Sequence, residues 1–123
     1  MQEFHIKENS KRARIAAYYL GFKNVAIVFG KTIFLWNITK QNFLNNEKHL
    51  AHELCHVRQY KQYGFVRFIF LYVLESLRKG YYNNRFEVEA RAAEVRQSWQ
   101  VSKTSQDLMQ FFKYFRVNLI FHF

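Results

Sequence analysis

Hydrophobic and polar residues first follow a strand-like pattern along this chain. Two runs rich in β-branched and aromatic residues, near Val25 to Phe29 and Thr32 to Trp36, are separated by Gly30 and Lys31. Apolar runs of this length around a two-residue loop that contains Gly are typical of a β-hairpin. The sequence therefore predicts two antiparallel strands joined by a tight turn.

A helical pattern follows the polar turn residues TKQNFLNN. Asn45 or Asn46 can cap a helix that runs from about Glu47 to Tyr63 and closes at Gly64. We expect one face of this helix to pack on the core and the other to carry polar chemistry. The first face carries Leu50, Leu54 and Val57, and the second carries His52, His56, Gln59 and Tyr63.

Two further helices are predicted downstream of this one. The first runs from about Phe65 to Lys79 and stops at Gly80, and because it is apolar on most faces we expect it to be buried. The second follows Asn84, a suitable cap, and extends from about Arg85 to Gln100. Its apolar residues at helical spacing are Val88, Ala92, Val95 and Trp99.

The two ends of the chain give weaker patterns. RIAAYYLGF, residues 14–22, fits either a short helix or a strand. Near the C-terminus, VNLIFHF, residues 117–123, fits a closing strand. Before it, apolar residues at i, i+3, i+4 and i+7 predict a helix, and these are Leu108, Phe111, Phe112 and Phe115.

Composition supports one α+β domain over residues 1–123. The chain has 123 residues, of which 50% are hydrophobic and 20% aromatic, which suffices for a packed core. We expect a β-hairpin or small antiparallel sheet packed on the Glu47–Tyr63 helix and on two to three further helices. The single cysteine, Cys55, excludes an internal disulfide framework.

Charge and targeting patterns narrow the class of partner only slightly. The net charge of +10 could attract nucleic acid, anionic lipid or an acidic protein, but no nucleic-acid-binding motif accompanies it. The N-terminus has no apolar signal-peptide core, so we expect a cytoplasmic protein. The most apolar stretch, GFVRFIFLYVLESL, is short for a membrane span and contains Arg67 and Glu75.

The stretch HELCH carries the clearest chemistry. On a helix, His52 and His56 lie one turn apart on the same face, so both imidazoles can bind one metal ion. Glu53 lies about 100° around the helix, where it can act as a general base toward an attacking water. Zinc at such a site lowers the pKa of water and polarises a carbonyl. The alternative is a chance match in a helix that binds no metal.

A catalytic zinc also needs a third protein ligand, and NNRFEVEARAAE offers Glu87, Glu89 and Glu94. With this second motif, residues 45–94 resemble the gluzincins, in particular minimal zincin-like domains of bacterial proteins with an E-x-E-A element. The resemblance implies His52, His56 and Glu87 as ligands of one zinc ion. Glu89 is the fallback ligand, because residues two apart on a helix lie about 200° apart and cannot both face the metal.

Two positions depart from the pattern of these relatives. Asn84-Arg85 stands where the family tends to have a Pro, and Arg91 stands where relatives often carry an Asp that orients a ligand histidine. Glu94, one turn after Arg91, could take over that role. Orienting partners of this kind change metal affinity by roughly 10 to 100-fold.

Other polar residues are candidates with open roles. His49 precedes His52 by one turn and could support a ligand, compete as one, or simply be an exposed polar residue, which is the simplest interpretation. Cys55 points to another face and fits a small core residue. A zincin also needs a donor for the oxyanion, and the candidates are Tyr81, Tyr82, Arg85 and His122.

These patterns predict a zinc-dependent metallopeptidase-like hydrolase acting on a peptide or protein. An extended peptide could pair with an edge strand above the metal, most naturally with Thr32 to Trp36. One alternative is a zinc-binding interaction module that is catalytically weak or inactive. Another is a cationic, aromatic module that contacts membranes peripherally through MQFFKYFRVNLIFHF at the C-terminus.

Overall fold

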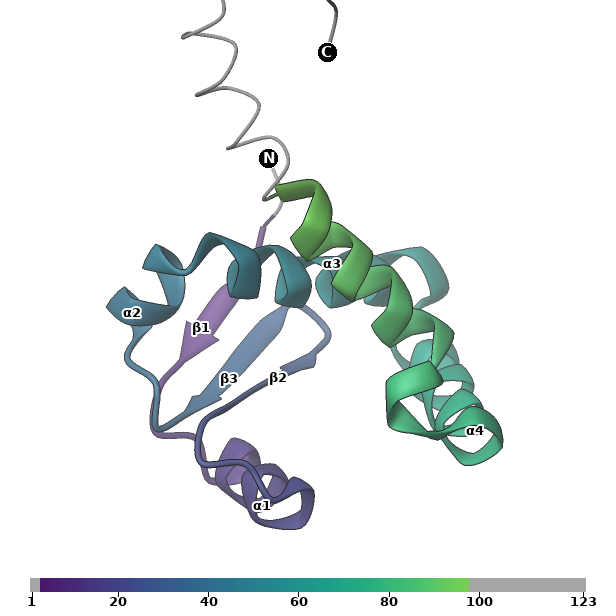
Figure 1. The fold of residues 1–123 in the computed structure, drawn as a ribbon, viewed down its shortest axis with the longest axis horizontal. Helices are drawn as coiled ribbons and strands as arrows, with labels where there is room; N and C mark the ends of the chain where they lie inside the picture. Colours follow the sequence, from purple (N-terminus) through teal and green to yellow (C-terminus); the bar gives the residue numbers. More distant parts are fainter. Residues whose placement is uncertain (1–2, 98–123) are drawn as a thin grey trace, which may run out of the picture.

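The computed structural model describes residues 3–97 of the chain, which form an α+β fold (Figure 1). The predicted fold class is therefore confirmed, with a sheet of three strands. Along the chain, the elements are β1 (His5–Lys7), α1 (Lys11–Leu20), β2 (Val25–Phe29), β3 (Thr32–Trp36), α2 (Lys40–Asn45), α3 (Glu47–Tyr63), α4 (Phe65–Asn83) and a last helix over residues 85–97. The predicted C-terminal helix and strand lie outside the described residues.

The predicted hairpin is present with the expected bounds. β2 and β3 pair antiparallel, with Phe29 opposite Thr32, so Gly30 and Lys31 form the loop. Gly30 has φ 65, the positive angle that a type II′ turn requires at its first central position.

The sheet also contains a strand that the sequence did not predict. β1 pairs parallel to β3, with Ile6 opposite Ile33, so the strand order is β1-β3-β2. The edge nearest α3 is therefore β2, and the prediction of a substrate edge at Thr32 to Trp36 is wrong because β3 is paired on both sides. A three-residue strand with one apolar position carries too little pattern to be recognised.

Alternate residues of β3 pack into two separate hydrophobic cores, one on each face of the sheet. Phe34 packs toward α1, where it meets Ala13 and Ala17. Ile33 and Leu35 point to the opposite face and pack with other buried residues, namely Phe43 of α2 and Val57 of α3. The period-two geometry of a strand thus places α1 below the sheet and α2 with α3 above it in Figure 1.

Two of the helices that cover the sheet, α3 and α1, have ends that are set by local signals. In α3, the Asn46 side chain accepts a hydrogen bond from the His49 backbone N–H at 3.1 Å, which confirms the predicted helix and one of its two predicted caps. Residues 14–22, whose sequence fitted either a helix or a strand, belong mainly to the helix α1. The Ser10 side chain caps that helix, and Gly21 ends it in the left-handed conformation with φ 74.

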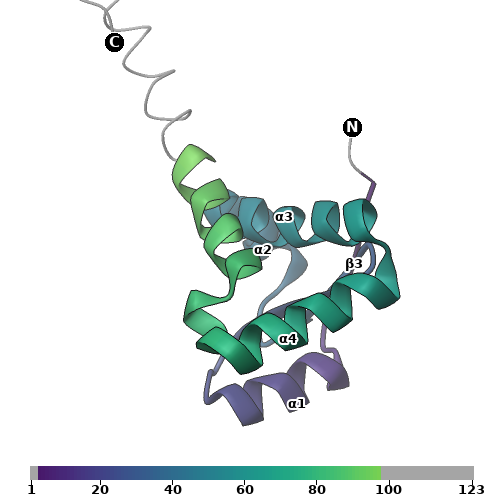
Figure 2. The ribbon, with the colours of Figure 1, turned by 90° about the vertical axis from the view of Figure 1, so that its right-hand side faces the viewer.

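α4 packs beside α3 at the right-hand side of Figure 1, so in Figure 2 it faces the viewer between α3 and α1. Its helical geometry breaks at the predicted position, Gly80, which has φ 82 and ψ 164. The prediction of a buried helix is wrong, because Phe68 is the sole fully buried residue of α4. A helix that is apolar on most faces does not encode which face meets solvent. Within residues 3–97, no helix is long and apolar enough to cross a membrane.

The last described helix begins at the predicted cap. The Asn84 side chain is fully buried, where it accepts from the Phe86 N–H and donates to the Tyr72 carbonyl oxygen and to Ser76 Oγ. This anchors the helix to α4. Its buried positions are Phe86, Glu87, Ala90 and Ala93, whereas the apolar residues noted in the sequence, Val88, Ala92 and Val95, are exposed and Trp99 lies outside the described residues.

Candidate metal centre

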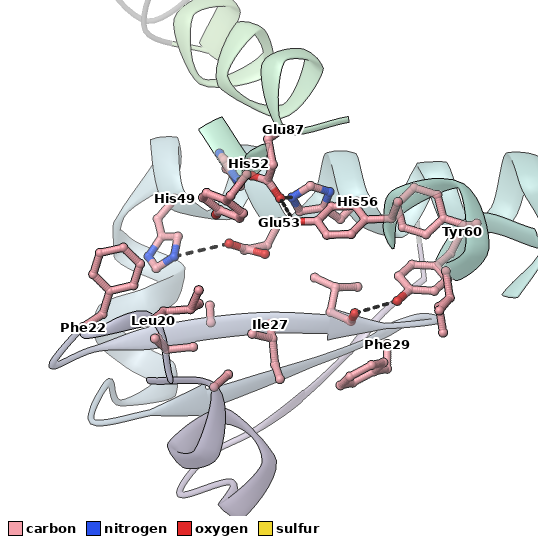
Figure 3. Close-up of a pocket in the computed structure, with 18 of the residues that line it drawn as sticks. Leu20, Phe22, Ile27, Phe29, His49, His52, Glu53, His56, Tyr60 and Glu87 are labelled. Atoms are coloured by element: carbon pink, nitrogen blue, oxygen red, sulfur yellow. Dashed lines mark hydrogen bonds and ion pairs between the residues drawn. The ribbon is translucent and has the colours of Figure 1, made fainter. Parts of the chain in front are cut away.

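Three residues from two helices meet above the sheet (Figure 3). His52 Nε2 and His56 Nε2, one turn apart on α3, each lie 3.1 Å from a different carboxylate oxygen of Glu87. One ligand atom from each of the three residues lies within 4.8 Å of the other two. The sequence-predicted ligand set is therefore brought together at one point.

The types of donor atom in this group suit a metal ion such as zinc. The two 3.1 Å separations end on different oxygens of Glu87 and are ion-pair distances, so the fit rests on the types of donor atom. Two imidazoles and one carboxylate are also the ligand types of many catalytic zinc sites, which leave a fourth position open.

The second nitrogen of each histidine is held by another side chain. His52 Nδ1 donates to Glu94 Oε2 at 2.8 Å, and His56 Nδ1 donates to Gln59 Oε1 at 2.8 Å. These bonds orient each Nε2 toward Glu87, as expected for ligand histidines. Glu94 thus orients His52, the task for which relatives often carry an Asp at the position of Arg91.

Glu87 is also held by a residue of a third element, Tyr72, which no sequence pattern predicts. The Tyr72 hydroxyl, on α4, donates to Glu87 Oε2 at 2.6 Å, and Glu87 itself is buried. Nothing in the sequence links a tyrosine to a carboxylate fifteen residues later on another helix. Gln59, in contrast, lies one turn from His56 and could have been recognised from that spacing.

The fallback ligand, Glu89, belongs to a different cluster. Its Oε1 accepts from Gln59 Nε2 at 3.1 Å and lies 3.6 Å from the Cys55 sulfur. The carboxylate is therefore on the far side of Gln59 from the histidines. Cys55 is almost fully buried, as expected for a small core residue.

In the metal-free protein, the site is a network of mutually stabilised charges. Burial lowers the pKa of His52, but the bonds to Glu87 and Glu94 and the charge of Glu53 outweigh it and raise that pKa to about 9. Burial also lowers the pKa of His56, but its interactions with Glu87 and Glu53 outweigh this effect and raise the pKa above its usual value. Burial acts to raise the pKa of Glu87, and the two histidines instead hold it well below its usual range. The positive charge at the site is thus carried by protons that a cation would replace.

Glu53, the predicted general base, lies beside this cluster on α3 and is 5% exposed. The His49 ring points at it, with Nε2 3.5 Å from Glu53 Oε1, and stacks edge-on against Phe43. His49 is half-buried, so its interpretation as an exposed polar residue is wrong. Its spacing of four residues from Glu53 was a signal for this pair.

A cavity of about 640 Å³ opens between β2, α3 and α4, and the three candidate ligands and Glu53 line it. Of the oxyanion candidates within the described residues, Tyr81 lines the cavity, whereas Tyr82 stacks against Arg91 and Arg85 stacks against Phe86. Burial, together with the charges of Glu87 and Glu53, raises the pKa of Tyr81, so its hydroxyl stays protonated near neutral pH. His122 lies outside the described residues.

Comparisons with known proteins give no family assignment. No family model matches the chain, and neither a curated protein nor a solved structure is significantly similar to it.

Proposed function

We propose that this protein is a zinc-dependent metallopeptidase-like hydrolase of the gluzincin type. The proposal rests on one observation, the convergence of His52, His56 and Glu87 beside the buried carboxylate of Glu53. A structural cluster of histidines and carboxylates would not need a general base at its side or an open cavity in front of it.

Each side chain has a defined role in this proposal. His52, His56 and Glu87 would hold the ion, which supplies a Lewis acid for a substrate carbonyl and makes water acidic. Glu53 accepts the proton of the attacking water and returns it to the leaving amine. The protonated Tyr81 hydroxyl, at the cavity wall, is the available donor for the developing oxyanion.

Within residues 3–97, β2 has a strand on one side only, and its other edge is the proposed substrate-binding edge. In a two-residue hairpin, alternate residues bond to the partner strand, so the backbone groups of Ala26 and Val28 point outward. The Tyr60 hydroxyl already donates to the outward carbonyl of Val28 at 3.0 Å. Ala26 remains available to pair with an extended peptide. Ala26→Pro should raise KM severalfold without loss of zinc, and an unchanged KM would contradict pairing at this edge.

Zinc content tests the ligand set directly. The purified protein should carry about one zinc, and His56→Ala and Glu87→Ala should each lose it. Glu89→Ala is the matched control, since its carboxylate lies on the same helix but bonds to Gln59, and it should keep the metal. If all four proteins remain metal-free after zinc is supplied, the proposal fails.

A zinc-binding module without catalysis is the second candidate, favoured by the small size of the domain. Glu53→Gln separates the two, because Glu53 is not placed as a ligand. A hydrolase should lose at least about a hundredfold in kcat on this substitution while its zinc content stays the same. Wild-type protein that holds zinc but cleaves none of a set of peptide libraries would favour the module.

A further inference from the structure

The outward face of α4 carries a continuous line of exposed apolar side chains. Val66, Phe70, Val73 and Leu77 follow helical spacing, so they fall within about 60° of the helix circumference. Their exposed fractions are 79%, 65%, 49% and 80%. We call these four residues the α4 stripe. The opposite side of the helix packs on the domain through Phe68, so the stripe is the face that residues 3–97 leave uncovered.

The stripe borders the mouth of the cavity. Val73 belongs to both, because it lines the cavity and is half-exposed. The other large apolar side chains that line the cavity and reach solvent are Leu20, Phe22, Phe29 and Tyr81. Exposed apolar side chains that lie next to one another mark an interaction site more often than singly scattered ones do.

The charges beside the stripe are basic. Arg67 and Arg78 are exposed and lie together about 100° around the helix from Val66, along one border of the stripe. The sole acidic residue of α4, Glu75, lies on the opposite side, where it pairs with Lys79 at 3.6 Å and accepts from the Arg85 N–H. The stripe therefore combines an apolar centre with a cationic border.

We propose that the α4 stripe docks on an anionic membrane surface. A helix with an apolar face and flanking arginines is suited to lie in the interface, with apolar side chains among the acyl chains and cations at the headgroups. A second copy of this chain, with its own net charge of +10, would bring like charges together. Residues 98–123 would also bring positive charge to this basic surface, since they contain three basic residues and one acidic residue.

Docking in this way would turn the cavity mouth toward the lipid surface. If the proposed hydrolase function also holds, its substrates would be peptide segments close to a membrane. The docking itself needs neither zinc nor catalysis, so it is tested separately from the proposed function.

Vesicle binding of the full chain is the first test. The protein should co-sediment with phosphatidylcholine vesicles that contain phosphatidylserine and much less with phosphatidylcholine alone. The double variant Phe70→Ser, Leu77→Ser should bind at least about tenfold more weakly, because both side chains lose burial in lipid. Val88→Ser, Val95→Ser is the matched control, since these residues are also exposed, at 47% and 63%, but lie on the last helix and should not contribute.

A local probe distinguishes α4 from the aromatic C-terminal segment. Cys55 is the single cysteine, and burial raises the pKa of its thiol to about 11, so an introduced cysteine reacts first. An environment-sensitive fluorophore on Leu77→Cys should brighten and shift to the blue when anionic vesicles are added, and one on Val88→Cys should not.

Three results would overturn the inference. Wild-type protein could fail to bind anionic vesicles, or the Phe70→Ser, Leu77→Ser variant could bind as tightly as wild type, which would assign binding to another segment. The substitutions could instead abolish self-association in gel filtration without affecting vesicles, which would make a second copy the occupant. Circular dichroism of both variants should match wild type, since none of the four positions is buried.

Discussion

Zinc binding near neutral pH should expel protons from the two histidines. The pKa of His52 is raised to about 9 because the carboxylates around it outweigh the effect of burial. At pH 7 such an imidazole is about 99% protonated, and zinc needs the electron pair that the Nε2 proton occupies. The pKa of His56 is also raised, while Glu87 stays ionised. Between one and two protons should therefore leave for each zinc bound.

The pH dependence of zinc affinity follows from the same pKa of His52. Deprotonating His52 at two pH units below its pKa costs about 2.7 kcal/mol, so zinc affinity should rise about tenfold per pH unit from this residue alone. Titration calorimetry at pH 7 in buffers of different ionisation enthalpy measures the number of protons released. Competition with a chelator between about pH 6 and 8 measures the change in affinity.

One variant makes the test specific to the observed contacts. Glu94→Ala removes a carboxylate that raises the pKa of His52, so as pH rises the number of protons released should fall earlier in this variant than in the wild type, a difference best measured near pH 8. A proton number near zero in the wild type, or an affinity that does not change with pH, would refute the charge network.

Three further outcomes are expected. Without metal, the raised pKa of His52 contributes stability that is fully present below its unfolded pKa of 6.5 and is lost as pH rises through about 9. The free energy of unfolding in urea should therefore fall between about pH 7 and 9, and a rise would contradict this assignment. Glu94→Ala should weaken zinc binding by roughly 10 to 100-fold and Glu94→Gln by less, because the amide oxygen can still accept from His52 Nδ1; equal losses would argue against orientation. Phe43→Ala should cost about 3–5 kcal/mol in urea unfolding, because Phe43 is fully buried, and a cost below about 1 kcal/mol would contradict the packing.

The elements predicted correctly are those whose cause is local. The β2–β3 hairpin follows from two apolar runs around Gly30, and α3 follows from the cap at Asn46 and the closure at Gly64. Inside α3, helical geometry fixes the distance between His52 and His56 before any tertiary contact forms. The two supporting pairs within the same helix, at His49 and Gln59, carry the same spacing signal.

The tertiary structure decided everything that depends on packing between distant segments. It placed β1 beside β3 and so made β2 the edge, and it brought Tyr72 of α4 against Glu87. It also set Glu94 against His52 across forty-two residues of chain.

The reason for this division is the range over which sequence periodicity acts. Periodicity determines which residues share a face of one helix or strand, and so it determined the histidine pair and the fact that Glu87 and Glu89 cannot both face it. It does not determine which face a neighbouring element covers. For that reason the sequence alone suggested a buried helix at residues 65–79, whereas packing through one side of α4 left its apolar stripe exposed.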